Sequence, residues 1–365
     1  MRIAEIENYN DFIALKDRGN GLLQKYDSTL FSTWEWLSTW WKHFGKERTL
    51  RVLVAEEKGE TLGIAPLMLS KYNARFLGQI RKIEFIGGWD SDYNDFILAK
   101  NSTDCLKLFL NHLLEFSDWD SLELREINEK SSSAKALQAI GNSQDQKLEM
   151  DISNFCPYIT LPTSLKVFTH SLSSNLRKNL RRYMRKLRQE YKVSFKTQSD
   201  FSSTREAVET FFKLHQKRWE SLGQPGAFAS KGSRDFHVEI AEIFDKRNWL
   251  ALYFLTANDE PIAAAYTFDY NLTKYARLTG FDPDFSRFRV GNLLKMHIAE
   301  DSIKKGLIEY NLSRGTGFGK EYWETGVRKN FVAKIYNKNW RGRAFSFAST
   351  FLPSRDKKGK LDNQQ

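Results

Sequence analysis

The sequence predicts a mixed α/β fold that occurs twice along the chain, as two domains that each hold a mixed sheet flanked by helices. The chain has 365 residues, 41% hydrophobic and 28% charged, which is typical of two soluble globular domains. The segment from Lys274 to Trp323 alternates strand, turn, helix and strand signals. In addition, VLVAEEKGETLGIAPLML (52–69) is similar to LYFLTANDEPIAAAYTFD (252–269). This internal repeat predicts one fold used twice.

The first domain is predicted to span residues 1–155. A tryptophan-bearing helix over 31–44 places Trp36, Trp40 and Phe44 on one face, which favours core packing, although such side chains also stack on ligands. A hairpin follows it around Lys58-Gly59-Glu60, and the polar segment 131–154 ends the domain. The remaining elements expected here are strands over 82–86, 94–98 and 121–127 and a helix over 103–116.

The second domain is predicted to span residues 156–352, with a polar tail over 353–365. Only this copy has a glycine turn into a helix and a glycine-rich loop after its last strand, so it is expected to carry the function and the first domain to act as a scaffold. Its expected helices lie over 174–192, 205–222, 235–245 and from Gly291 to Gly306. Its expected strands lie over 249–256, 262–270, 275–281, 307–312, 331–337 and 343–350.

Most of the net charge of +11 lies in the helix over 174–192. Eight basic residues and the acid Glu190 give this helix a charge of +7, whereas the rest of the chain is nearly balanced. The pattern has two interpretations: a solvated face over a packed apolar stripe, or a positive wall for an anionic substrate. The basic residues are Arg177, Lys178, Arg181, Arg182, Arg185, Lys186, Arg188 and Lys192, and the stripe is Leu176, Leu180, Tyr183, Leu187 and Tyr191.

The sequence lacks the features of several functional classes. There is no apolar run long enough for a membrane span and no signal-peptide pattern at the N-terminus, so a cytoplasmic protein is expected. Cys105 and Cys156 lie far apart, and no metal site or stable DNA partner is expected. GTGFGKEY is not a phosphate loop, because Arg314 replaces the required glycine and Glu321 follows Lys320 in place of Ser or Thr.

The candidate site residues lie at the predicted ends of elements in the second domain. The helix that begins at Gly291 directs free backbone N–H groups into the preceding turn, which suits an anion such as a diphosphate, and Arg287 and Arg289 add charge. The same pattern also fits a plain βαβ unit with solvated arginines. The other candidates are His215, Arg218 and Trp219 on one helix face, Asp282 at a strand end, and Arg314, Lys320, Tyr322 and Trp323 after the last strand.

These residues resemble a known family. The segments that carry the resemblance are DEPIAAAYTF, YARLTGFDPD, RVGNLLKMHIAEDSIKKG, IEYNLSRGTGFGKEYW, HQKRWESLG and SSNLRKNLRRYMRKL, with FSTWEWLSTWW and GETLGIAPLML in the first half. Together they resemble the GNAT (Gcn5-related N-acetyltransferase) superfamily, and within it the tandem BioF2-like/CelD-type acetyltransferases related to FemABX transferases. The superfamily loop usually reads Arg/Gln-x-x-Gly-x-Gly/Ala, and here Phe288 and Leu293 replace its first and last residues.

The resemblance implies acyl transfer from a thioester such as acetyl-CoA to an amine, without a metal. Carried over by position, it places the base at His215 or Asp282, the acid at Tyr322, and the oxyanion donor at a backbone N–H near Thr279 or Gly280. The implied cofactor-binding residues are Arg289, Val290, Gly291 and Asn292. The implied substrate-binding residues are Arg218, Trp219, Tyr275, Arg314, Lys320 and Trp323.

Three functions are compatible with this resemblance. The first is an N-acyltransferase acting on an amine of a cell-envelope or polysaccharide precursor, that is, on a small-molecule, sugar or peptide substrate. The second is a Fem-like transferase that uses aminoacyl-tRNA, with the basic helix as the tRNA contact. The third is a non-catalytic binding protein on a degenerate GNAT fold, an alternative that the departures in the loop at Gly291 leave open.

Overall fold

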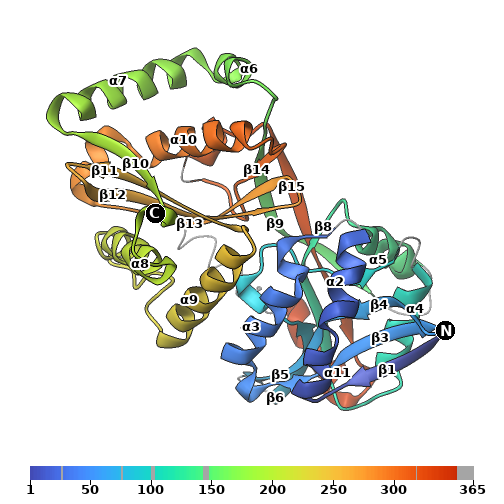
Figure 1. Cartoon of the computed structure of the whole chain (residues 1–365). Coiled ribbons are helices and arrows are strands. Elements are labelled where there is room, and N and C mark those ends of the chain that lie inside the picture. Colours follow the sequence, from blue (N-terminus) through green and yellow to red (C-terminus); the bar gives the residue numbers. More distant parts are fainter. Residues whose placement is uncertain (26–27, 75–76, 100–102, 143–147, 318, 352–365) are drawn as a thin grey trace. The chain divides into compact units, whose positions relative to one another are not determined.

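The computed structural model describes residues 1–25, 28–74, 77–99, 103–142, 148–317 and 319–351 (Figure 1). It divides into two compact units: the first holds residues 1–155 and the residues from Arg328 onward, and the second holds Cys156–Val327. The chain enters the second unit within β9 (Glu149–Thr160) and returns to the first within β15 (Gly326–Tyr336). This division differs from the prediction of one domain over 156–352, because β15 pairs with β8 of the first unit.

The first unit contains two groups of strands and six helices among its described residues. One group has the antiparallel order β1-β3-β4-β7, and the other has the order β15-β8-β6-β5-β2, in which only β6 and β8 are parallel. The helices are α1 (Tyr9–Ala14), α2 (Lys16–Lys25), α3 (Trp34–Phe44), α4 (Thr103–Leu114), α5 (Ser132–Asn142) and α11 (Trp340–Phe351). The strands are β1 (Arg2–Ile6), β2 (Thr49–Leu50), β3 (Val52–Glu57), β4 (Glu60–Ala65), β5 (Leu67–Ala74), β6 (Gly78–Phe85), β7 (Ile97–Leu98) and β8 (Ser121–Asn128).

Two predicted elements of the first unit have different outcomes. In α3, Thr33 accepts a hydrogen bond from the Trp36 N–H as the helix cap, and Trp36 and Trp40 are buried, so the core-packing interpretation is confirmed. The predicted strand over 343–350 is wrong, since these residues belong to α11. The Asn339 side chain accepts a hydrogen bond from the Gly342 N–H at 2.7 Å, which starts a helix where alternating phenylalanines suggested a strand.

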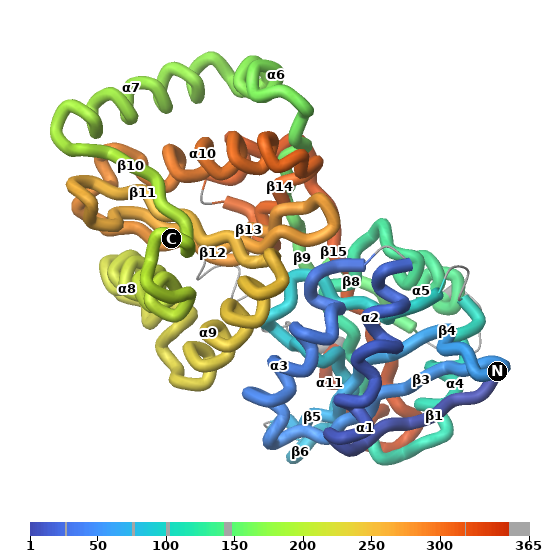
Figure 2. The backbone as a smooth tube through the Cα atoms, in the orientation of Figure 1, coloured from blue at the N-terminus to red at the C-terminus, as the bar shows by residue number. Residues whose placement is uncertain are grey.

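The second unit is a mixed sheet with helices on both faces, so the predicted mixed α/β class is confirmed. The strand order is β10-β11-β12-β13-β14-β9, antiparallel except for the parallel pair β13 and β14. Figures 1 and 2 show α8 and α9 on one face of the sheet and α10 on the other, with α7 outside α10. The helices are α6 (Leu165–Ser171), α7 (Ser174–Glu190), α8 (Thr204–Glu220), α9 (Lys231–Lys246) and α10 (Val290–Lys304). The strands, besides β9, are β10 (Val193–Thr197), β11 (Leu250–Ala257), β12 (Glu260–Tyr270), β13 (Thr273–Phe281) and β14 (Glu309–Asn311).

The sheet of the second unit opens between its two parallel strands. Among the described residues, β13 pairs with β14 only over 273–275 and 309–311, although β13 continues to Phe281. A bulge lies at the point of divergence, because Thr267 of β12 faces Ala276 and Tyr266 faces Leu278, which leaves Arg277 as the extra residue. The edge of β13 from residue 276 to 281 therefore borders an opening in the sheet.

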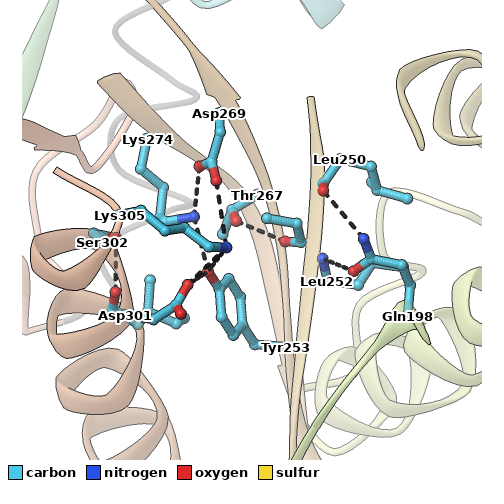
Figure 3. A network of polar contacts seen from close by, with 12 residues as sticks. Gln198, Leu250, Leu252, Tyr253, Thr267, Asp269, Lys274, Asp301, Ser302 and Lys305 are labelled. Atoms are coloured by element: carbon cyan, nitrogen blue, oxygen red, sulfur yellow. Dashed lines mark hydrogen bonds and ion pairs between the residues drawn. The ribbon is translucent and has the colours of Figure 1, made fainter. Parts of the chain in front are cut away.

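A buried polar network joins β13 to its neighbours at the closed end of this opening (Figure 3). The Lys274 side chain is 0% exposed, and its Nζ donates to Asp269 Oδ1 at 2.5 Å and to the Tyr253 hydroxyl at 3.0 Å. Tyr253 donates to Asp301 of α10, which also pairs with Lys305 at 2.8 Å. Burial lowers the pKa of Lys274. Burial also opposes ionisation of Asp301, but hydrogen bonds from Lys305 and Tyr253 outweigh it, so the pKa of Asp301 is lowered. These contacts stabilise the strands where they are still paired.

Candidate active site

The turn that leads into α10 leaves the start of that helix open. The 3-10 helix η5 (Pro283–Phe288) ends at Arg289, which has left-handed backbone angles (φ 51°, ψ 42°). The Arg289 side chain makes no cap hydrogen bond to α10, and a Cβ added at the exposed Gly291 would meet no heavy atom of the described residues within 4 Å outside its own helical turn. The Asn292 and Leu293 N–H groups both bond to the Arg289 carbonyl, and the Val290 side chain is buried. The space beside Gly291 is therefore open for at least a methyl-sized group, at a helix start of the kind that favours anions.

Basic side chains of α7 lie beside this turn. Arg182 donates to the Tyr183 hydroxyl at 3.1 Å, and Arg287 pairs with Glu190 at 2.5 Å. Hydrogen bonds from Arg182 and then Arg289 lower the pKa of Tyr183, so both guanidinium groups lie close to that hydroxyl. The packed stripe of the basic helix is confirmed, because its apolar side chains are buried or partly buried in the core of the second unit. The turn thus receives positive charge from two elements.

On the opposite face of the sheet, His215 of α8 is held in an internal hydrogen bond. The Trp219 indole N–H donates to His215 Nε2 at 2.9 Å, so we assign the remaining proton to Nδ1, which has no partner among the described residues. The His215 side chain is 1% exposed. Burial lowers its pKa to about 4, with smaller effects from Arg218 and Arg277, and the imidazole is therefore neutral at pH 7.

The close packing of α8 on β13 depends on one glycine. A Cβ at Gly280 would lie 2.4 Å from the backbone nitrogen of His215, a distance that real Cβ atoms do not show. This contact brings Arg218 to the unpaired edge of β13, where its Nη1 donates to Thr279 Oγ1 at 3.0 Å. Its guanidinium also lies 5.2 Å from the centre of the Phe281 ring, and burial lowers its pKa.

The carboxylate of Asp282 is occupied by two local contacts. One oxygen pairs with Lys217 at 2.7 Å, and the other accepts a hydrogen bond from the Asp284 N–H at 3.2 Å as the cap of η5. These contacts hold the turn between β13 and α10 in place. Proton transfer at Asp282 would require it to leave Lys217.

The loop after β14 contacts α10 and is held by hydrogen bonds of its own. The Lys320 ammonium, in the 3-10 helix η6 (Lys320–Tyr322), donates to the carbonyls of Ser313, Arg314 and Gly315 at 3.3, 2.9 and 3.1 Å. Trp323 is 2% exposed, and its indole N–H lies 3.4 Å from Asn292 Oδ1 of α10. In contrast, the Tyr322 side chain is 69% exposed. The loop is therefore anchored on α10 through Trp323.

Lys295 is a candidate that the sequence interpretation missed. Its Nζ lies 5.6 Å from the centre of the Trp323 ring. Its pKa is lowered to about 8, mainly by burial and also by the charges of Lys320 and Arg218, against the opposing effect of Glu321. The signal was its spacing, because Lys295 follows Gly291 by four residues and so lies on the same helix face.

Three cations on different elements influence one another electrostatically. The charges of Lys320 in η6 and Arg218 in α8 both lower the pKa of Lys295 in α10. The predicted substrate contact Tyr275 is buried at the last paired position of β13, opposite Asn311. Within the described chain, no group of three or more metal-binding side chains occurs, and no helix is both long and apolar enough to cross a bilayer.

Comparisons with known proteins bear on the fold. Residues 174–323 match the family model of the acetyltransferase (GNAT) domain, and no curated protein sequence matches the chain significantly. The crystal structure of FemX is similar with a TM-score of 0.62 at 13% identity, covering 93% of this chain and 98% of that one. L-PGS from Bacillus licheniformis is similar with a TM-score of 0.55 at 12% identity, covering 93% and 95%. A conserved protein of unknown function from Bacteroides thetaiotaomicron VPI-5482 is similar with a TM-score of 0.57 at 11% identity, covering 92% of this chain and 100% of that one. At these identities the solved structures inform on the fold alone.

Proposed function

We propose that this chain, which has a GNAT/FemABX-related fold, is an N-acyltransferase that moves an acyl group from a thioester such as acetyl-CoA to an amine. The observation that carries the proposal is the opening between β13 and β14, with the uncapped start of α10 beside it. The unpaired edge of β13 offers backbone groups to an extended donor, and the helix start offers an anion site for its diphosphate. The acceptor that we propose is an amine of a cell-envelope or polysaccharide precursor.

The donor would bind at the turn before α10. In the proposed complex the Gly291 N–H receives the diphosphate, with the Arg289 guanidinium and the Asn292 side chain alongside and Val290 fixing the turn from the core. The helix dipole and the basic residues of α7 favour a negatively charged ligand at this end of α10. Because space at Gly291 is open, the ligand needs no rearrangement of the backbone.

The chemistry that we propose is direct attack. The neutral amine nitrogen attacks the thioester carbonyl carbon, the carbon–sulfur bond breaks, and its electron pair leaves with sulfur as the thiolate. A backbone N–H at Thr279 or Gly280, on the unpaired edge of β13, would stabilise the oxyanion. The ammonium proton would pass to a base and the thiolate would take a proton from an acid, for which we propose Tyr322.

Two groups are proposed for the base, and they make different demands on the protein. His215 is neutral at pH 7 and can accept a proton, but only if Trp219 releases its Nε2. Asp282 would have to separate from Lys217. Alanine substitution at each position, with coenzyme A release corrected for donor hydrolysis, assigns the role, because an unchanged kcat removes that residue from the mechanism.

Donor binding is tested by a pair of substitutions that differ only in charge. Gly291→Glu places a carboxylate where the diphosphate is expected, and Gly291→Gln places a neutral side chain of the same shape in the same open space. Calorimetry with acetyl-CoA should show binding to the Gln variant and a loss of about 100-fold, or about 2.7 kcal/mol, for the Glu variant. Equal affinities of the two variants, or no binding to the wild type, would contradict the proposal.

The basic face of α7 supports a second candidate, a transferase that uses aminoacyl-tRNA. Six basic side chains of this helix are exposed: Lys178, Arg181, Arg182, Arg185, Lys186 and Arg188. Their contact with a phosphate backbone predicts tRNA binding that weakens steeply between 50 and 200 mM salt, by about 10³-fold or more for six contacts. Filter binding of charged tRNA over this range, set against acetyl-CoA calorimetry, separates the two donors. If the protein binds neither acetyl-CoA nor charged tRNA, the third alternative, a non-catalytic binding protein on this fold, would describe it better.

A further inference from the structure

We propose that α11 binds the surface of an anionic lipid bilayer, with the rings of Trp340 and Phe347 at the interface and basic side chains beside them on the headgroups. α11 belongs to the first unit, whereas the residues of the candidate active site belong to the second. The inference therefore goes beyond the proposed function and does not depend on it. The helix would lie on the bilayer, since its 12 residues are too few to cross one.

Two phenylalanines of α11 lie on different sides of the helix. Residues two positions apart on a helix point in nearly opposite directions, which separates Phe345 from Phe347. The Phe345 ring lies 5.9 Å from the ring of Tyr336 in β15, and its centre lies 5.9 Å from Lys82 Nζ of β6. The Phe347 side chain, in contrast, is 70% exposed. The strand that the sequence predicted over 343–350 would have put both rings on one side.

Trp340 and Phe347 form what we call the aromatic face of α11. They are seven residues apart, or two helical turns, so they lie on the same side of the helix. The Trp340 side chain is 69% exposed, and the small residue Ala344 lies between the two rings along this side. A single exposed aromatic residue is common in proteins, but two in register on one helix form an apolar surface that suits a binding partner or a membrane.

The other side of α11 is fixed to the first unit. A Cβ at Gly342 would lie 2.8 Å from the carbonyl oxygen of Asp120, the residue before β8, so the helix begins in close contact with that segment. Two turns later, the Ser349 and Tyr336 hydroxyl groups lie 2.9 Å apart. Because Gly342 and Ser349 share the side of the helix opposite the aromatic face, these contacts direct that face outward.

The charge around the aromatic face suits anionic lipid. The Arg341 guanidinium lies 5.2 Å from the centre of the Trp340 ring, and Arg343, one turn from Trp340, is exposed. The sequence of α11 contains no acid, and residues 352–360 add four basic residues and one acid. Aromatic rings bordered by arginines are typical of helices that lie in the bilayer interface.

Acidic side chains near the start of α11 do not cancel this charge. Two aspartates lie in the segment against which the helix begins, and each is paired with an arginine: Asp118 with Arg51 at 2.6 Å, and Asp120 with Arg81 at 2.9 Å. Their negative charges are therefore largely neutralised within the first unit. The arginines of α11 remain as the charge that a headgroup would meet.

Sedimentation of the full chain with lipid vesicles tests the inference. The wild type should bind vesicles of phosphatidylcholine mixed with phosphatidylglycerol more tightly than vesicles of phosphatidylcholine alone. Replacing both aromatic residues, Trp340→Ser with Phe347→Ser, should weaken binding to the mixed vesicles by at least about tenfold. Arg343→Gln should weaken it by about fivefold. Trp89→Ser is the matched control, because Trp89 is 61% exposed in η3 (Gly88–Asp90) of the same unit and should not contribute.

A fluorescence measurement separates α11 from the basic helix α7, which would also attract anionic vesicles. Brominated phosphatidylcholine quenches tryptophan side chains that enter the bilayer, and α7 contains no tryptophan. Mixed vesicles that contain this lipid should quench the wild type. Trp340→Phe keeps the aromatic face but lacks this indole, so it should bind the vesicles and lose the quenching. Circular dichroism confirms that each variant is folded.

Four results would overturn the inference. They are a wild type that does not bind the mixed vesicles, equal binding of the wild type to vesicles with and without phosphatidylglycerol, equal binding of the wild type and the double serine variant, and quenching that persists in Trp340→Phe. Light scattering adds a further test. A wild-type dimer that the double serine variant converts to a monomer would identify the aromatic face as an interface between two copies of the chain instead of a membrane site.

Discussion

Replacing Lys295 with methionine should stabilise the folded protein although it removes a side chain from the site. Burial and neighbouring cations lower the pKa of Lys295 from 10.5 to about 8. One pKa unit corresponds to about 1.4 kcal/mol, so holding this ammonium charged in the folded state costs on the order of 3 kcal/mol. Loss of the contact with the Trp323 ring offsets about 0.5–1 kcal/mol of the gain. The net increase in the free energy of unfolding at pH 7 should be about 2 kcal/mol.

The pH dependence of this gain has a defined sign. The folded pKa lies below the unfolded one, so the unfolded chain binds more protons between pH 8 and 10.5 and the wild type becomes more stable as the pH rises through this window. The cost of Lys295 is fully present below pH 8 and disappears toward pH 10.5. The advantage of Lys295→Met should therefore be largest at pH 7 and much smaller at pH 10.

Denaturant unfolding at low salt measures the difference, with amide hydrogen exchange in α10 identifying the transition of the second unit. Lys304→Met, at an exposed position of the same helix, should change the stability by no more than about 0.5 kcal/mol. A Lys295→Met protein that is less stable than the wild type at pH 7, or a difference that does not change up to pH 10, would refute the reasoning.

Three further substitutions test the framework of the site. Gly280→Ala should destabilise the second unit by about 3 kcal/mol or more, because the new methyl group would meet the backbone of His215. Gly291→Ala should leave the stability within about 1 kcal/mol of the wild type, since space is open there and Ala suits a helix. Lys274→Met should cost about 3–5 kcal/mol by leaving the Asp269 carboxylate without its buried partner. Thermal and denaturant unfolding measure all three.

Internal controls sharpen two of these tests. Combining Lys274→Met with Asp269→Asn removes both charges, so the double variant should recover part of the stability lost in the single variant. An equal loss in both proteins would show that packing, not charge, is responsible. A Gly280→Ala protein as stable as Gly291→Ala would contradict the contact between α8 and β13.

The features that followed from local periodicity were predictable from the sequence. The apolar stripe of the basic helix, the tryptophan helix and the strand–turn–helix unit at Gly291 each depend on residues only a few positions apart. The predicted helix at Gly291 is α10, and the strands on either side of it are β13 and β14. The segments of the second half that carry the family resemblance lie in the same region, and residues 174–323 match the GNAT domain model.

The features that depend on distant contacts were not predictable in this way. Residues 343–350 alternate like a strand, but Asn339 starts a helix there by a hydrogen bond that the alternation does not reveal. The bulge at Arg277 is set by the register of β12 against β13, which the sequence of either strand leaves undetermined. The low pKa of Lys295 arises from burial and from charges on two other elements. The spacing of Lys295 predicts that it shares a helix face with Gly291, but only the folded chain shows which residues surround its side chain.

Among the described strands β15 comes last, and its residues from 328 onward belong to the first unit, so a ribosome completes the inserted second unit before the first unit has all of these strands. The two ends of the insert meet, as the Thr325 N–H bonds to the Tyr158 carbonyl at 2.9 Å, so residues 156–327 can fold as they emerge. Until residues 328–336 arrive, the edge of β8 on which β15 pairs stays open in the nascent chain. A premature stop near residue 327 would leave the second unit complete. The first unit would lack β15, so the edge of β8 would stay unpaired and prone to aggregation.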